Sequence, residues 1–300
     1  MDLRKTTVCI AVIFSLLCLS SCGKNPSAPG KAGGDLIIGS KNFTENIVLA
    51  NLMALVIEDK TDIHVKLKTN LGGSNIAWTA LRKGSIQIYP EYTGTIVQNY
   101  YQSKTGSPEE TLSITRKLLN QDKLAFLSPF GFNNSYTLAV QQETAQKFNL
   151  QTYSDVAKVA PKLSLSCPFE FVDRPDGYPG LRDAYNLNFR KVKGMDTGIM
   201  YRLIAQRDTD VVTAYTTDGQ VSINKLKLLV DDRSFFPPYD AGPLVRQDTL
   251  NQYPQLAEVL NTLHNQISEK EMQEMNAKVD EGYKAEQIAA DFLKQKGLIR

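Results

Sequence analysis

Apolar positions in the first third of the chain alternate between two periods. Residues 35–39 form a short apolar run that ends in glycine, as expected for a buried strand. Residues 44–58 carry apolar side chains at helical spacing, with Asn42 or Thr44 as the cap. The same pattern predicts a strand at 64–69, a helix from 72 through 81 and a strand at 86–89. This order is typical of a parallel sheet covered by helices.

The alternation restarts after Tyr136 and predicts a second α/β unit. The predicted order is strand 137–140, helix 154–160, strand 163–166, helix 180–185, strand 189–192, helix 198–207, then strands at 210–215, 227–230 and 242–246, with helices from 248 onward. We therefore expect two lobes, residues 35–135 plus 238–300 and residues 136–237, joined by two crossings near 133–138 and 235–240. Ligands of open α/β sheets bind at the carboxyl ends of strands, so the cleft between the lobes is the expected site.

The first 22 residues differ from the rest. Arg4 and Lys5 precede an apolar run of about 14 residues, which is too short to cross a bilayer and typical of a signal peptide. The segment that ends at Cys22 resembles a bacterial lipobox, so we expect residues 1–21 to be removed and Cys22 to be lipidated. Residues 22–34 are rich in Gly, Pro, Ser, Lys and Ala and predict a flexible tether. The alternative is a plain secretory signal with an incidental cysteine.

Charge and motif content narrow the function. The net charge is +2 and the basic residues are spread along the chain, so we expect no nucleic-acid surface. After Cys22, Cys167 is the remaining cysteine, which excludes an intramolecular disulfide in the body and favours a buried inert thiol. His64 and His264 have no metal-ligand spacing, and no catalytic motif is present. We expect no metal, no cofactor and no enzyme, although the paired acids of a hydrolase leave no spacing signature.

Four tyrosines fall at strand ends or crossings. They are Tyr92, Tyr136, Tyr215 and Tyr239. In a two-lobed protein these positions border the cleft, so the four rings can form an aromatic box around a cation that cannot be hydrogen-bonded, such as trimethylammonium. The alternative is that they are ordinary half-buried tyrosines, since the chain has 13.

Three further residues can bind a carboxylate. Arg174 lies in a Pro/Gly turn and offers a planar fork, Lys41 lies at an expected helix start, which favours anions, and Thr95 offers a hydroxyl. The alternatives are a salt bridge of Arg174 to Asp173 or Asp176, a solvated surface charge for Lys41, and a helix cap for Thr95.

Six stretches follow one another over nearly the whole body of the chain: 39–45, 89–95, 130–136, 173–177, 214–218 and 236–239. Together they resemble the glycine betaine/carnitine/choline-binding proteins of ABC osmoprotectant importers. The resemblance implies a type II periplasmic-binding-protein-like fold whose two α/β lobes close over a cage made of Tyr92, Tyr136, Tyr215 and Tyr239. It implies a carboxylate clamp of Lys41, Thr95 and Arg174, with help from the backbone of Asn134.

The resemblance also implies partners and a location. We expect a monomeric extracytoplasmic receptor, anchored by lipid to a bacterial membrane, that delivers a quaternary-ammonium compound to an ABC permease with a separate ATPase. The neutral Thr95 tolerates carboxylated ligands, whereas an aspartate there would favour choline, and this indicates glycine betaine, carnitine or broad ligand use. The rival interpretations are a receptor of the same fold for another small solute such as an amino acid, a lipoprotein hydrolase, and a ligand-sensing domain.

Overall fold

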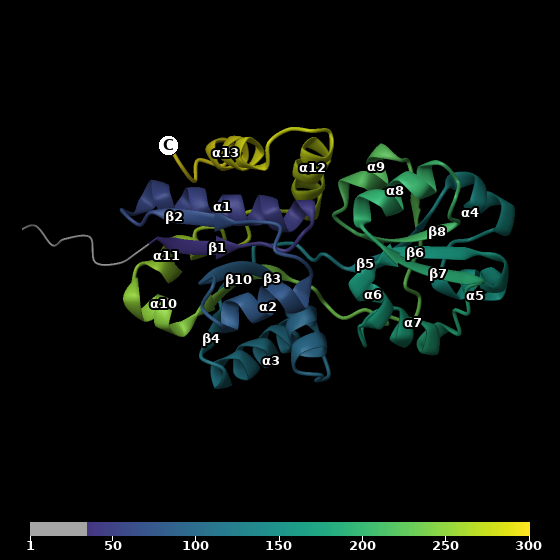
Figure 1. Ribbon diagram of the computed structural model, residues 1–300, viewed down its shortest axis with the longest axis horizontal. Coiled ribbons are helices and arrows are strands. Elements are labelled where there is room, and N and C mark those ends of the chain that lie inside the picture. The colour runs from purple at the N-terminus through teal and green to yellow at the C-terminus, as the bar shows by residue number, and fades with distance from the viewer. Residues whose placement is uncertain (1–34) are drawn as a thin grey trace, which may run out of the picture. The chain divides into compact units, whose positions relative to one another are not determined.

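Two five-stranded sheets organise the chain in the computed structural model, which describes residues 35–300 (Figure 1). We call each sheet with its helices a lobe. The first sheet has the order β2-β1-β3-β10-β4 and the second β7-β6-β8-β5-β9. The strands are β1 (Leu36–Gly39), β2 (Val65–Lys68), β3 (Ile88–Tyr92), β4 (Leu124–Phe126), β5 (Tyr136–Val140), β6 (Ser164–Pro168), β7 (Lys191–Met195), β8 (Val211–Tyr215), β9 (Lys227–Leu228) and β10 (Ala241–Arg246).

Helices cover both faces of the first sheet. Helices α1, α12 and α13 lie on one face and α2 and α3 on the other (Figure 1). A π-helix, η1 (Thr95–Tyr100), follows β3 and was not predicted from the sequence. The α-helices of this lobe are α1 (Thr44–Lys60), α2 (Ser74–Arg82), α3 (Pro108–Gln121), α10 (Gln247–Gln252), α11 (Leu256–Asn261), α12 (Glu269–Asp280) and α13 (Ala285–Gln295).

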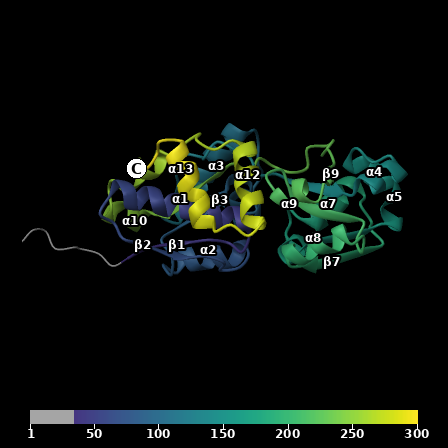
Figure 2. The ribbon, with the colours of Figure 1, turned by 90° about the horizontal axis from the view of Figure 1, so that it is seen from above.

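The second lobe carries shorter helices. Helix α9 packs against α12 of the first lobe, so the two lobes touch beside the cleft (Figure 2). The helices are α4 (Gln142–Phe148), α5 (Tyr153–Val159), the 3₁₀ turn η2 (Ala160–Lys162), α6 (Phe169–Asp173), α7 (Tyr178–Tyr185), α8 (Thr197–Ala205) and α9 (Gly219–Ile223). Between residues 35 and 300, no helix is both long and apolar enough to cross a membrane.

The expected parallel sheet is correct for most strands and wrong for one strand in each sheet. Strands β1, β2 and β3 are parallel, as are β6, β7 and β8. In contrast, β10 runs antiparallel to β3 and β4, and β5 runs antiparallel to β8 and β9. The predicted strand 86–89 also continues to Tyr92. Pro90 suggests a strand end, but it lies inside β3, where its ladder partner is Pro243 of β10, so two residues without an N–H face each other.

Helix α1 is buried on almost every side. Its apolar residues, such as Leu49, Leu52 and Met53, have no exposed surface, because the helix lies between the sheet and the helices α11, α12 and α13. The predicted cap at Asn42 or Thr44 is wrong, since Phe43 is the N-cap and its side chain makes no capping hydrogen bond. The extended backbone at Phe43 instead places the ring beside the expected site.

The predicted amino-terminal features lie outside the described residues. These are the signal peptide 1–21, the lipidated Cys22 and the tether 22–34. We retain 35–135 plus 238–300 and 136–237 as proposed lobe limits. Cys167 lies in β6 with no exposed surface, and burial raises the pKa of its thiol to about 12, so it is an unreactive core residue.

Candidate functional site

One small hollow brings together every residue predicted for ligand binding. It lies between the ends of the two sheets, and its lining also includes Phe43 and Glu170, which the sequence analysis missed. The full lining is Lys41, Phe43, Tyr92, Thr95, Asn134, Tyr136, Glu170, Arg174, Tyr215 and Tyr239.

Strand pairing explains why the four tyrosines converge. Tyr136 begins β5 and lies directly opposite Tyr215 at the end of the antiparallel strand β8. Tyr92 ends β3 opposite Ala241, and Tyr239 lies two residues before that position on the second crossing. The carboxyl end of β3 and the crossing therefore carry two rings to the same edge, where the second lobe presents the other two.

The rings contact one another in this conformation. The ring centroid of Tyr136 lies 4.7 Å from that of Tyr215 and 5.5 Å from that of Tyr239. Phe43 stacks between the two lobes, 6.3 Å from Tyr92 and 5.8 Å from Tyr215. The hollow that remains has a volume of about 10 Å³, room for about one water molecule. A trimethylammonium group fits only if the rings separate.

Two of the phenol hydroxyls fix their rings. Tyr92 donates to Glu45 Oε1 at 2.7 Å, and Tyr239 donates to Asp176 Oδ2 at 2.9 Å. Burial raises the pKa of all four cage tyrosines above its ordinary value of 10. Each ring therefore stays a neutral phenol, whose π face is suited to a cation.

Lys41 is a buried charge rather than the solvated surface charge of the alternative interpretation. It is 2% exposed, and its Nζ lies 2.5 Å from Glu91 Oε1 and 3.1 Å from Ser74 Oγ. The ammonium also lies 5.0 Å from the ring centroid of Tyr92. Glu91 neutralises most of the field that Lys41 can offer a ligand carboxylate.

Arg174 makes the ion pair with Asp176 that the sequence left open. The guanidinium donates through Nε and Nη2 to the two oxygens of Asp176, which is a bidentate contact between buried groups. Its Nη2 also lies 3.5 Å from Thr95 Oγ1, which begins η1. The guanidinium carbon lies 5.8 Å from the Tyr136 ring centroid, so the arginine borders the cage.

Asn134 lines the hollow and makes hydrogen bonds from both its backbone and its side chain. Its backbone N–H donates to the carbonyl of Tyr239 at 3.1 Å and is therefore already used. Its side-chain Nδ2 donates to Glu45 Oε1 at 2.6 Å. Its buried Oδ1 has no hydrogen-bond partner among the described residues. The side-chain oxygen of this residue, which lines the hollow, is therefore an acceptor without a partner among the described residues.

Glu45 supports the cage from behind and was missed by the sequence analysis. Its buried carboxylate accepts hydrogen bonds from the side chains of Tyr92, Asn134, Thr217 and Asn276. Burial raises the pKa of Glu45, and the four hydrogen bonds oppose that rise. In the sequence, an acid in the first turn of a helix is explained by the helix dipole alone, so nothing marks its role.

Comparison with known proteins agrees with this geometry. The model of one protein family, OpuAC, described as the substrate binding domain of ABC-type glycine betaine transport systems, matches residues 34–295. The chain belongs to this family. By this description, the OpuAC family consists of transport substrate-binding proteins.

Individual relatives give the same result. The carnitine transport binding protein OpuCC of Listeria monocytogenes is 33% identical over 291 residues, 96% of this chain and 94% of the relative. A glycine-betaine-binding protein of Pseudomonas aeruginosa is 33% identical over 298 residues, 94% of each chain. The crystal structure of a glycine betaine/carnitine/choline ABC transporter protein is 32% identical, with a TM-score of 0.72 over 88% of this chain and 99% of that one. The chain therefore has the type II periplasmic-binding-protein-like fold.

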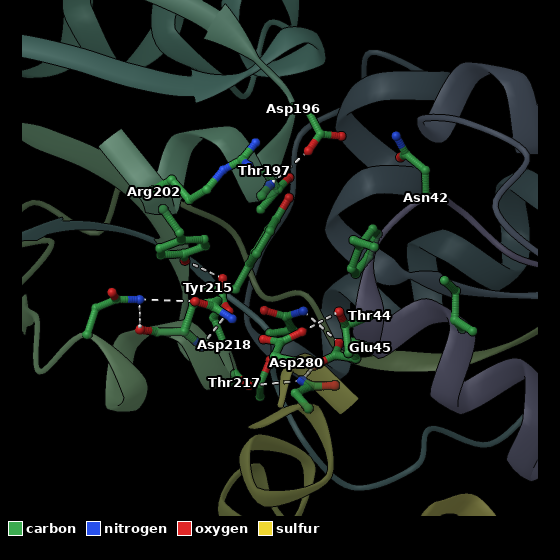
Figure 3. A pocket seen from close by; sticks show the side chains of 18 of the residues that line it. Asn42, Thr44, Glu45, Asp196, Thr197, Arg202, Tyr215, Thr217, Asp218 and Asp280 are labelled. Carbon is green, nitrogen blue, oxygen red and sulfur yellow. Dashed lines mark hydrogen bonds between the residues drawn. The ribbon is translucent and has the colours of Figure 1, made fainter. Parts of the chain in front are cut away.

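A wider cleft adjoins the cage of this OpuAC-family protein. It measures about 570 Å³ and is bordered by Glu45, Asp196, Asp218 and Asp280, with Arg202 also on its wall (Figure 3). Phe43 and Tyr215 line both this cleft and the small hollow, so their stacked rings separate the two spaces.

Asp218 in this cleft has a strongly shifted pKa. Burial raises the pKa of its carboxyl to about 7, against a hydrogen bond from Tyr201 that lowers it. The acids Asp280 and Glu45 raise it further through repulsion. The wall of the cleft therefore changes charge near neutral pH.

Proposed function

We propose that this protein captures a small quaternary-ammonium compound, of the glycine betaine, carnitine or choline kind, and delivers it to an ABC permease driven by a separate ATPase chain. The observation that carries the proposal is the convergence of Tyr92, Tyr136, Tyr215 and Tyr239 on one hollow. The match to relatives named for carnitine and glycine betaine covers 94% of the length of each relative, which supports the same ligand class.

The aromatic cage supplies the recognition. A methylated nitrogen has no N–H to donate, so water and protein hydrogen bonds give it little selectivity. The faces of neutral phenols attract it at about 1–2 kcal/mol each when water is excluded. Four faces are enough for micromolar binding, which requires about −8 kcal/mol, when a clamp on the other end of the ligand contributes the remainder.

Binding requires the lobes to open and close. The rings from the two lobes touch in the closed conformation, and polar contacts also cross the cleft: Arg174 donates to Ser74 Oγ at 3.2 Å, and Thr217 donates to Glu45. We propose that opening of the lobes separates Tyr215 and Tyr136 from Tyr92 and admits the ligand. Closure then brings these residues together again around the ligand. Ligand then favours the closed state through contacts that only this state provides.

The protein acts as a carrier and not as an enzyme. A ligand of this kind should be recovered chemically unchanged after prolonged incubation with the protein, as measured by proton NMR. Release of trimethylamine or any other product would support the rival interpretation as a hydrolase.

A titration panel tests the ligand class directly. We expect calorimetry to detect micromolar binding of at least one of glycine betaine, carnitine and choline, and none of an amino acid without a quaternary nitrogen, such as glutamine. Binding of the amino acid alone would exclude the proposal in favour of the rival solute receptor.

The clamp is tested by changing its geometry while keeping its charge. Replacement of Arg174 by alanine would leave the buried Asp176 unpaired and endanger the fold, so Arg174→Lys is the better variant. Lysine cannot reproduce the planar fork, and we expect the affinity for glycine betaine to fall about tenfold more than that for choline, which has no carboxylate. Equal losses for the two ligands would exclude Arg174 as a clamp.

We further propose that Cys22 carries a lipid and holds the receptor at the outer face of a bacterial membrane. The lipobox-like segment before Cys22 supports this, and stable anchoring requires at least two acyl chains. The mass of the amino-terminal fragment of the mature protein tests it. A fragment that begins at another residue and has the unmodified mass would exclude lipidation.

A further inference from the structure

Glu170 is the one acidic side chain among the residues that line the hollow within the described range. It lies on α6 of the second lobe, and its carboxylate reaches across to the first lobe. Its Oε2 accepts a hydrogen bond from the backbone N–H of Ser74, the first residue of α2, at 2.9 Å. Its Oε1 lies 3.5 Å from Nη1 of Arg174. Glu170 thus bridges a helix start in one lobe and the proposed clamp in the other.

The hydrogen-bond donors of Arg174 are almost all used by other residues, which leaves Glu170 at the one donor that remains. A guanidinium has five N–H groups. Two go to Asp176, one to Thr95 Oγ1 at 3.5 Å and one to Ser74 Oγ at 3.2 Å. The Nη1 group that remains faces Glu170. A ligand carboxylate can therefore bind Arg174 in this conformation only where the Glu170 carboxylate already lies.

The surroundings are shaped for a carboxylate. The start of α2 offers its backbone N–H and the positive end of its dipole. Gly73 permits the close approach, because a Cβ there would lie 2.7 Å from Glu170 Oε2. Glu170 also adds one negative charge to this region, because Lys41 is already paired with Glu91 and Arg174 with Asp176.

We propose that Glu170 is a specificity-determining residue, an internal carboxylate that occupies the position of the ligand carboxylate and closes the cleft when the ligand has none. The inference rests on the proposed function, because it assumes that the ammonium group lies in the tyrosine cage. A purely cationic ligand such as choline leaves Glu170 in place and is attracted by the negative charge of its carboxylate. A zwitterion such as glycine betaine must displace it, so Glu170 opposes the preference for carboxylated ligands that the neutral Thr95 predicts.

The test compares Glu170→Gln with a matched control, Asp173→Asn. Both variants remove one acid from the same short helix, but Asp173 is exposed and does not line the hollow. Dissociation constants for glycine betaine and choline are measured by calorimetry for both variants and the wild type. We expect Glu170→Gln to shift the ratio of affinities toward glycine betaine about tenfold, and Asp173→Asn to leave it within about twofold.

Chemical rescue gives a second measurement on Glu170→Ala. If the vacated position binds a carboxylate, added acetate should strengthen choline binding and weaken glycine betaine binding to this variant, at ionic strength matched with chloride, with neither effect in the wild type. An unchanged ratio in Glu170→Gln, or an equal shift in Asp173→Asn, would overturn the inference while the proposed function stands. A wild type that binds neither compound would remove the proposed function, and the inference with it.

Discussion

Replacement of Tyr215 by leucine tests whether the cage binds charge or only excludes water. The Tyr215 ring closes one side of the hollow, 4.7 Å from Tyr136 and 5.8 Å from Phe43 by ring centroids. It is only partly buried, whereas Tyr136 is 5% exposed and contacts several other rings. Leucine retains the apolar bulk and removes the π face, so the fold should survive while one face of the cage is lost.

The expected magnitude follows from one cation–π contact. A desolvated contact contributes about 1–2 kcal/mol, so Tyr215→Leu should weaken choline binding by about 5- to 30-fold. Tyr215→Phe keeps the face and should change the affinity by less than about threefold. Tyr283→Leu is the control for the substitution itself, because Tyr283 is 61% exposed and lies outside the hollow.

A neutral ligand of the same shape isolates the charge. In 3,3-dimethylbutan-1-ol a carbon replaces the quaternary nitrogen of choline, so it fills the same space without the positive charge. Calorimetric titration of both compounds into the wild type and Tyr215→Leu gives a thermodynamic cycle of two ligands and two proteins. The substitution should weaken the affinity for choline and leave the affinity for the neutral alcohol unchanged. An equal loss for the two compounds would refute the reasoning, since the ring would then act as an apolar wall only.

Two further predictions concern stability. The pKa of Asp218 is raised from 3.8 to about 7, so between these values the folded protein binds more protons than the unfolded chain and the free energy of unfolding falls as pH rises. Asp218 is partly exposed, which limits the decrease in the free energy of unfolding to about 1–2 kcal/mol. Urea unfolding from pH 4 to 8 should show this decrease in the wild type and not in Asp218→Asn. Gly94→Ala would place a Cβ 2.9 Å from the Tyr239 ring. Thermal unfolding should therefore show a free energy of unfolding lower by about 1–3 kcal/mol, and calorimetry should show a weaker affinity for choline. An unchanged Tm would contradict this packing.

The sequence predicted most elements because periodicity is a local property. The strands β5 and β8 were placed closely enough to put Tyr136 at a crossing and Tyr215 at a strand end, and this placement, with that of Tyr92 and Tyr239 and the family resemblance, indicated the cage. Strand direction is not local. The antiparallel entry of β10 depends on the path of the chain after the second crossing, and no pattern within 242–246 indicates that path.

The charged part of the site was the least predictable. Lys41 pairs with Glu91 and Arg174 contacts Ser74, partners that lie 50 and 100 positions away in the sequence. Spacing within a motif cannot reveal such pairs. The sequence therefore indicated the cations and offered Asp176 as one possible partner, but it missed Glu91 and Glu170, two other acids that reduce the attraction of these cations for an anion.

The closed cage sets a limit on affinity. Opening the hollow for a ligand separates rings that now stabilise one another, and each aromatic pair contributes about 0.5–1.5 kcal/mol beyond its buried area. Tyr136 has such contacts with both Tyr215 and Tyr239, and Phe43 stacks on Tyr215. The gain from four cation–π contacts is reduced by these lost pairs, so binding measures the difference between two sets of aromatic contacts. A neutral ligand loses the same pairs without gaining the cation–π term. The closed cage therefore lowers the affinity for both ligands equally, and the ratio of the two affinities is set by the cation–π contacts alone.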